Sequence, residues 1–404
     1  MPFLRNKKEL GLLISLLSAL GVGPVLVFGL SAVSDLIISD LGISEAQFGL
    51  VATVCFGVGA FGNILLARFA DRHRDTILFT VIFGFSAVGL LIASIHGNYA
   101  LLLVAAAMAG IAQSFPNGVT NRVIVQRVPE AKRIRWTGVK QSGVQIYQLI
   151  SSLAFPLMVV SLGWRGASLA AALCVSAVGF FSLRAIKIYP SLHGHDDVKQ
   201  QIKTAELQKS EGPKRRYRTL VVMLAVFGFF NGIGVQATNV YAALFAVREL
   251  NFPLFIGGAT AAVAGIVGVA ARLAWSALMA RGFSAQRLLI VLASLATSGG
   301  LTFVASHTIH SAPLMWLAVS LHGIAALGVS VVLMAALLRA IPATRMGSAS
   351  GIVSAGQYGG FTVGPLIVGG LIGTDGGFFI AWLAVTLAYL ICVAIGIFMV
   401  KTTK

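Results

Sequence analysis

The chain has 404 residues, of which 57% are hydrophobic and 11% charged, and its mean hydropathy is +0.89. These values exclude an ordinary soluble helical protein, whose helices need polar faces, because most apolar stretches here are apolar all round. The formal net charge of +17 could suggest a nucleic-acid partner. Lys and Arg crowd into alternate loops, however, which is typical of a membrane protein and not of a nucleic-acid-binding surface.

Twelve apolar stretches follow one another along the chain, and each is long enough to cross a hydrocarbon core of about 30 Å as a helix. The first is too long for a cleaved signal sequence, so we expect it to stay in place. The fold class is therefore an all-α membrane protein. With ends uncertain by about 2–4 residues, the predicted spans are 9–34, 46–69, 76–95, 100–126, 137–161, 165–187, 219–247, 255–280, 286–306, 312–338, 347–372 and 377–400.

The second half of the chain repeats the first at an offset of 213 residues. Arg68 and Arg281 stand at this spacing, as do Pro129 and Pro342, together with several glycines. Two copies of a six-helix unit in one membrane chain are the layout of a secondary transporter.

The halves and their connector follow from the spans. We predict an N-terminal six-helix bundle at 1–187, a cytoplasmic linker at 188–217 and a C-terminal six-helix bundle at 218–404. The basic loops place both termini in the cytoplasm of a multi-pass protein of the bacterial inner membrane. The linker is interpreted as a solvated segment with a short amphipathic helix, in preference to a metal site at His193 and His195.

Two six-helix halves, a central cytoplasmic loop and inward termini resemble the major facilitator superfamily over essentially the whole chain. That family has a Gly-x-x-x-Asp-Arg-x-Gly-Arg signature after its second span. This chain keeps Asp71 and Arg72 there and lacks both glycines and the final basic residue. The resemblance implies that Asp71, with Arg72, latches the two halves together at the cytoplasmic face. Ordinary loop charges are the alternative interpretation.

Three basic residues lie within the spans, where an ionisable side chain costs several kcal/mol and suggests function. Arg272 lies about 13 Å from the cytoplasmic end of its span, Arg122 lies nearer the inner end of another, and Lys140 is on the first turn of the next. Each has an alternative: Arg272 could cap helix carbonyls, Arg122 could extend to the interface, and Lys140 could be an inner gate residue.

None of the thirteen Asp and Glu residues lies at the midplane of a predicted span. Buried cations without acidic partners favour a positively charged cavity for an anionic substrate, and arginine suits bidentate binding of a carboxylate.

The sequence around Arg272 reads Ala-Ala-Arg-Leu-Ala-Trp-Ser-Ala-Leu. It resembles the same helix of monocarboxylate transporters and oxalate–formate exchangers. That resemblance implies that Arg272 binds the substrate carboxylate. The acidic residue that monocarboxylate transporters place one turn earlier is Gly268 here, which puts proton coupling at that position in doubt.

Polar residues at comparable depth complete the predicted cavity, although such residues also tie membrane helices together. His322 is the deep group that titrates near neutral pH, so it is the candidate proton carrier, with a neutral hydrogen-bonded histidine as the alternative. Besides Arg272 and Arg122, the predicted substrate-binding residues are Gln113, Asn117, Asn121, Gln145, Tyr147, Asn231, Gln236, His322, Gln357 and Tyr358.

The sequence thus predicts a carrier and not an enzyme. We expect it to move a small organic anion, in particular a carboxylate, by alternating access, without a cofactor and as a monomer in the lipid bilayer. A drug or hydrophobic-solute efflux carrier is the alternative, but it would favour a membrane carboxylate that the spans lack. The sequence leaves the direction of transport open, and also the choice of H⁺ or Na⁺ as coupling ion.

Overall fold

The structure is a computed structural model that describes residues 7–65, 73–189, 214–340 and 343–402, and all regular structure in these ranges is helical. Contacts divide the chain into two compact units. The first comprises Met1–Leu30 and Val54–Thr204, and the second Ser31–Thr53 and Ala205–Lys404. The contacts therefore group Ser31–Thr53 with the C-terminal half, although they precede most of the N-terminal half in sequence. Most of the predicted linker lies outside the described ranges.

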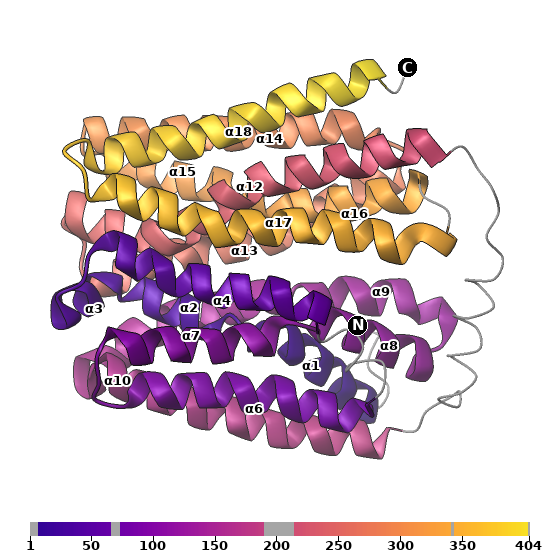
Figure 1. The fold of residues 1–404 in the computed structure, drawn as a ribbon, viewed down its shortest axis with the longest axis horizontal. Coiled ribbons are helices and arrows are strands. Elements are labelled where there is room, and N and C mark those ends of the chain that lie inside the picture. The colour runs from indigo at the N-terminus through magenta and orange to yellow at the C-terminus, as the bar shows by residue number, and fades with distance from the viewer. Residues whose placement is uncertain (1–6, 66–72, 190–213, 341–342, 403–404) are drawn as a thin grey trace. The chain divides into compact units, whose positions relative to one another are not determined.

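The first unit is built around α6, which packs against α7 and α10, while α10 also packs against α1 (Figure 1). Helices α2 and α4 begin in one unit and end in the other. The helices of the N-terminal half, apart from α3, are α1 (Lys7–Gly21), α2 (Val25–Ala32), α4 (Glu45–Leu65), α6 (Asp75–Ser94), α7 (Tyr99–Gln113), α8 (Pro116–Arg127), α9 (Glu130–Gln141) and α10 (Gly143–Ile188).

The second unit is centred on α12, which packs against α17, α18 and α13, while α14 packs against α15 and α18. Its helices are α3 (Ser34–Leu41), α12 (Lys214–Glu249), α13 (Leu254–Ala280), α14 (Ala285–Thr308), α15 (Ala312–Ile324), the 3₁₀ turn η1 (Ala326–Gly328), α16 (Val329–Ala340), α17 (Ala343–Ile372) and α18 (Gly377–Thr402).

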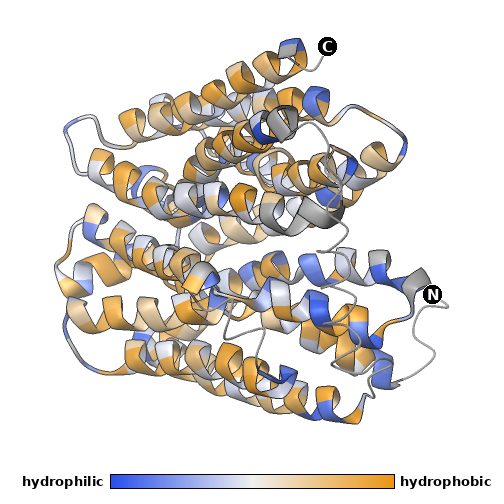
Figure 2. Cartoon of the chain, turned by 45° about the vertical axis from the view of Figure 1, so that its right-hand side comes forward, coloured by the Kyte–Doolittle hydropathy of each residue, from blue (hydrophilic) through white to orange (hydrophobic). Residues whose placement is uncertain are grey.

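The described helices agree with the twelve predicted spans. Nine are long and apolar enough to cross a membrane, and the bent pair Lys8–Gly21 and Val25–Ala32 makes a tenth. One of the nine, Trp136–Ile188, has 53 residues, or about 80 Å of helix, and divides into two spans at Gly163. The twelfth is α17, which is rich in glycine. Apolar residues cover most of the helical length, and hydrophilic residues gather towards the helix ends (Figure 2).

Four spans are interrupted where the sequence predicted continuous helices, and the fifth span has a one-residue break at Ser142, between α9 and α10. The first bends by 63° between α1 and α2. The fourth breaks between α7 and α8, and the tenth breaks between α15 and α16. Helices α8 and α16 begin at Pro116 and Val329, which are one repeat of 213 residues apart. Because only one of the two has proline at this point, the break belongs to the repeat and not to a particular residue type. Equivalent interruptions in two repeats are a typical sign of a transport site.

Glycines set the distance between α12 and α17. On one face of α17, Gly356, Gly360 and Gly364 follow one another at intervals of four residues. A Cβ atom added to any of them would overlap a backbone carbonyl oxygen of α12, at Ala225, Phe229 and Ile233 respectively. The two backbones are therefore in direct contact, as is common where small residues line a membrane helix interface.

Gly360→Ala should consequently destabilise the protein, because the new methyl group must push α17 away from α12. We expect a loss of about 1–3 kcal/mol, which is the usual cost of overpacking. The matched control is Gly351→Ala on the same helix, where an added Cβ meets nothing within 4 Å. Thermal unfolding of both variants in detergent tests this, and equal midpoints would contradict the proposed close contact.

Candidate functional site

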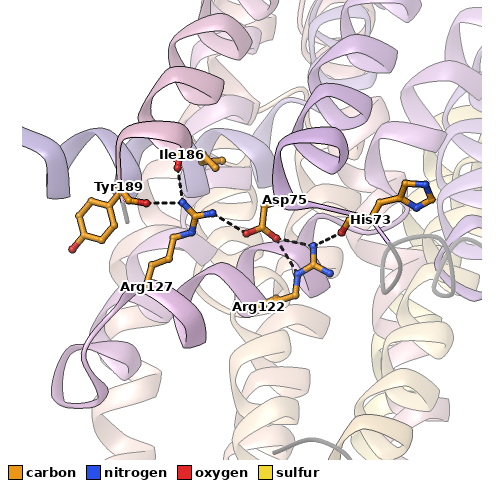
Figure 3. Close-up of polar contacts among 6 residues, drawn as sticks. All are labelled: His73, Asp75, Arg122, Arg127, Ile186 and Tyr189. Carbon is orange, nitrogen blue, oxygen red and sulfur yellow. Dashed lines mark hydrogen bonds and ion pairs between the residues drawn. The ribbon is translucent and has the colours of Figure 1, made fainter. Parts of the chain in front are cut away.

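A carboxylate lies between two arginines where α6, α8 and α10 meet in the first unit (Figure 3). Asp75 is at the start of α6, and its Oδ1 accepts hydrogen bonds from Arg122 Nη2 at 2.7 Å and Nε at 3.0 Å. Arg127 Nη2 donates to Asp75 Oδ2 at 3.0 Å. The arginines also donate to backbone carbonyls, Arg122 to His73 and Arg127 to Ile186 and Tyr189. The cluster thereby ties three helix ends together.

This arrangement corrects one expectation from the sequence. Arg122 was predicted to lack an acidic partner, but Asp75 supplies one, and the Asp75 side chain is only 8% exposed. The guanidinium of Arg122 is held by this pair and by a carbonyl. Asp71 and Arg72, the predicted latch, lie outside the described residues.

Lys140 is buried among neutral oxygens at the end of α9. Its Nζ donates to Thr120 Oγ1 at 2.7 Å and Asn121 Oδ1 at 2.6 Å, with the Asn117 carbonyl oxygen at 3.5 Å. Within the described parts of the chain, no carboxylate contacts this ammonium group, which is 0% exposed. Lys140 thus joins α9 to α8 through two predicted site residues, Asn117 and Asn121, at the cost of a buried charge.

Replacing Lys140 by Met should therefore not lower stability, and we expect a gain of about 1 kcal/mol because burial of an uncompensated cation is unfavourable. Thermal unfolding in detergent measures the change. Lys132→Met is the control, since Lys132 is exposed and pairs with Glu9, and it should change stability by less than about 0.5 kcal/mol. A marked loss for Lys140→Met would show that its hydrogen bonds outweigh the cost of burial.

The other predicted residues of the first unit also make contacts within it. Gln113, which ends α7, donates from Nε2 to Cys55 Sγ at 3.0 Å. The ring of Tyr147 packs against Gly21, where a Cβ atom would overlap it. Gln145 is 3% exposed on α10. The contacts of Gln113 and Tyr147 join helices, and Gln113 lies at the break between α7 and α8.

In the second unit, three side chains converge on the interrupted tenth span. Arg272 Nε donates to the Leu327 carbonyl at 3.0 Å. Trp275, one turn further along α13, donates from Nε1 to the Ile324 carbonyl at 2.8 Å. Asn231 Nδ2 on α12 donates to the Ala326 carbonyl oxygen at 3.3 Å. They satisfy carbonyl groups that the break releases from helical hydrogen bonding.

His322 lies one turn before this break and is 4% exposed. Its Nε2 is 3.2 Å from Asn239 Oδ1, and its Nδ1 is 3.5 Å from the Tyr389 hydroxyl. A neutral ring suits these partners, because Nε2–H can donate to Asn239 while Nδ1 accepts from Tyr389. The geometry therefore agrees with the alternative of a neutral, hydrogen-bonded histidine.

Gln236 carries an unused donor in the same unit. It is 2% exposed, and its Nε2 has no hydrogen-bond partner among the described residues. A buried donor of this kind is unfavourable by about 1–3 kcal/mol unless a ligand or water accepts from it. Gln357, on α17, packs against Gly228, and the half-buried Tyr358 ring lies 5.6 Å from that of Phe361.

The structure adds residues that the sequence did not single out. Asp75 and Arg127 lie near the ends of predicted spans, where charged residues are common and carry no signal of their own. Trp275, Asn239 and Tyr389 had no distinguishing pattern, because their partners are 49, 83 and 67 residues away. The candidate site of the second unit is therefore Arg272, Asn231 and His322 at the break, together with the buried Gln236 on α12.

A family model described as Major Facilitator Superfamily matches residues 10–365. A curated protein of Haemophilus influenzae, described as "Putative metabolite transport protein", is 25% identical over 250 residues, which are 59% of this chain and 58% of that protein. The aligned part therefore spans less than two thirds of this relative's length.

Solved transporters share the fold at low sequence identity. A bacterial homolog of the human lysosomal transporter Spinster, inward-facing and occupied, gives a TM-score of 0.74 at 16% identity, with 98% of this chain and 97% of that chain covered. A mutant of the nucleoside transporter NupG gives 0.68 at 13% identity, with 96% and 99% covered. At these identities the likeness concerns the fold alone.

Proposed function

Since the chain belongs to the Major Facilitator Superfamily and is a multi-pass membrane transporter, we propose that its cargo is a small organic anion carrying a carboxylate group. It would move this anion by alternating access. We also propose that both termini lie in the cytoplasm of a bacterial inner membrane, on the basis of the basic loops.

The observation that carries the proposal is the position of Arg272. It lies eight residues before the last residue of α13, about 12 Å along the helix, and its guanidinium reaches the break in the tenth span. A cation at this depth is expensive unless water or an anion faces it. Its planar donors match a carboxylate.

Two neutral amides support the assignment. The unused Nε2 of Gln236 offers a donor to an anionic oxygen, and Asn231 already donates at the break. A donor-rich surface suits an anion better than it suits a hydrophobic drug, the alternative cargo. The relative described as a metabolite transporter is consistent with a small metabolite.

We propose that His322 carries the coupling proton, and that it does so in a conformation of the protein other than the one described here. In this structure both ring nitrogens face neutral partners, so protonation of Nδ1 requires Tyr389 to move or to turn its hydroxyl. Such a movement would have to accompany transport.

A thermal-shift screen of the purified protein tests the proposal. Formate, acetate, lactate, oxalate and larger carboxylates would be compared with uncharged amides of the same size and with cationic drugs. At 100 times its Kd, a ligand stabilises the folded protein by about 2.7 kcal/mol. Stabilisation by cationic or neutral compounds alone would refute an anionic cargo.

A further inference from the structure

An arginine at the end of α12 holds two carboxylates from the distant N-terminal sequence. Arg248 Nε donates to Asp35 Oδ1 at 2.7 Å, and Arg248 Nη1 to Glu45 Oε1 at 2.5 Å. Asp35 is on α3 and Glu45 begins α4. The three side chains are 18–34% exposed, so water reaches them. According to the loop charges, this end of the helices is the outer one.

Neutral contacts continue from these ion pairs along α4. The Tyr241 hydroxyl lies 2.8 Å from the Glu45 carbonyl oxygen and 3.0 Å from that of Pro365 on α17. Further along α4, Thr53 Oγ1 donates to the Thr362 carbonyl at 2.6 Å. The contacts therefore cover Glu45 to Thr53, which is about 12 Å of helix.

Small residues allow the backbones of α4 and α17 to approach each other here. A Cβ atom on Gly49 would overlap the Pro365 carbonyl, and one on Gly369 would lie 2.7 Å from the Glu45 carbonyl oxygen. This packing explains why Ser31–Thr53, which we call the strap, groups with the C-terminal half.

The strap is joined to the rest of its own half at points that can bend. Before it, the first span bends by 63° between Gly21 and Val25. Val33, between α2 and α3, has non-helical angles of φ −126° and ψ 26°. After it, α4 contains Gly57, Gly59 and Gly62, and each glycine in a helix lowers helix stability by about 1 kcal/mol relative to alanine.

We propose that Arg248, Asp35 and Glu45 form the latch of an outer gate, which fastens the strap to α12 and α17 and releases it when the outer face opens. The latch depends on charge and is partly hydrated, whereas the deeper contacts of Tyr241 and Thr53 are neutral. The ion pairs are thus the part of these contacts that water and salt reach. The proposal rests on alternating access but not on the nature of the cargo.

Distances between spin labels measure strap release without any cargo. Labels would be placed on cysteines at Ser39 of α3 and Thr308 of α14, both exposed, after Cys55, Cys174 and Cys392 are changed to serine. The purified full-length protein would be compared with Arg248→Ala and with the isosteric double variant Asp35→Asn and Glu45→Gln. Arg165→Ala is the matched control, because this arginine lies two residues after the Gly163 break, at the end of the helices that the loop charges make the outer one.

We expect the ratio of long to short distances to rise about fivefold or more in both latch variants, and to stay unchanged in the control. High salt should raise the same ratio of long to short distances in the protein with an intact latch, because salt screens partly exposed ion pairs.

An unchanged distance distribution in folded latch variants would overturn the proposal. If Arg248→Ala does not fold, the double variant decides, since it keeps the side-chain volumes. The thermal-shift screen tests the anionic cargo, and the label distances test the latch. Because the two measurements are independent, either proposal can fail without the other.

Discussion

Arg272→Ala is expected to abolish binding of the anion that the thermal-shift screen identifies. Removing one member of a buried, hydrogen-bonded charge pair weakens binding by about 2–5 kcal/mol, or at least about 30-fold in Kd. Arg272→Lys should keep the charge but lose bidentate geometry, so we expect about a tenfold loss. Isothermal titration of purified variants measures both.

The structure also predicts a stability effect for Arg272→Ala. The Leu327 carbonyl would lose its donor at the break of the tenth span, at a cost of about 1–3 kcal/mol. Arg281→Ala is the control, since this exposed residue ends the same helix, and it should leave affinity unchanged. If Arg272→Ala bound the anion as tightly as the starting protein while losing stability, Arg272 would be a carbonyl cap and the anion proposal would fail.

The second large effect is predicted for Asp75→Asn. This change leaves Arg122 and Arg127 beside a neutral amide in a largely buried cluster. Breaking a buried ion pair usually costs about 3–5 kcal/mol, so we expect a loss near the lower end of that range. Thermal unfolding in detergent would show it as a strongly lowered midpoint.

Two comparisons isolate the cause of that loss. Asp375→Asn, in an exposed turn, should change the midpoint little. Combining Asp75→Leu with Arg122→Met and Arg127→Met should recover much of the stability, because an apolar replacement removes the uncompensated charges as well. A midpoint for Asp75→Asn equal to that of the control would mean that the cluster contributes nothing to folding.

The membrane spans could be predicted from sequence because their signal is local. Each is a run of about 20 apolar residues, and the described helices follow the predicted order with ends that differ by a few residues. The breaks could not be predicted in the same way. Pro116 gives a local signal for one, but Val329 gives none for its equivalent, where distant residues, Arg272 and Trp275, donate to the carbonyls at the break.

The sequence could not predict which distant residues form ion pairs and hydrogen bonds with the residues of the candidate site. The expectation for Arg122 failed because Asp75 is 47 residues away in sequence, and residue spacing does not reveal contacts at that separation. The carbonyl partner of Arg272 had been anticipated only as an alternative. The sequence predicted Lys140 on the first turn of the fifth span, whereas the structure places it in the last turn of α9, among neutral oxygens of α8.

The helix that joins the fifth and sixth spans has a practical consequence for topology mapping. Only Gly163 leaves the helical conformation inside α10, with φ 66° and ψ 172°, a combination that residues with a Cβ atom rarely adopt. The fifth and sixth spans are therefore connected by a single non-helical residue and not by a loop. An epitope tag or a protease site inserted there would unwind helix on both sides, whereas the turn around Thr374 and Asp375 offers exposed backbone for the same reporter. Antibody accessibility is therefore better measured at that turn.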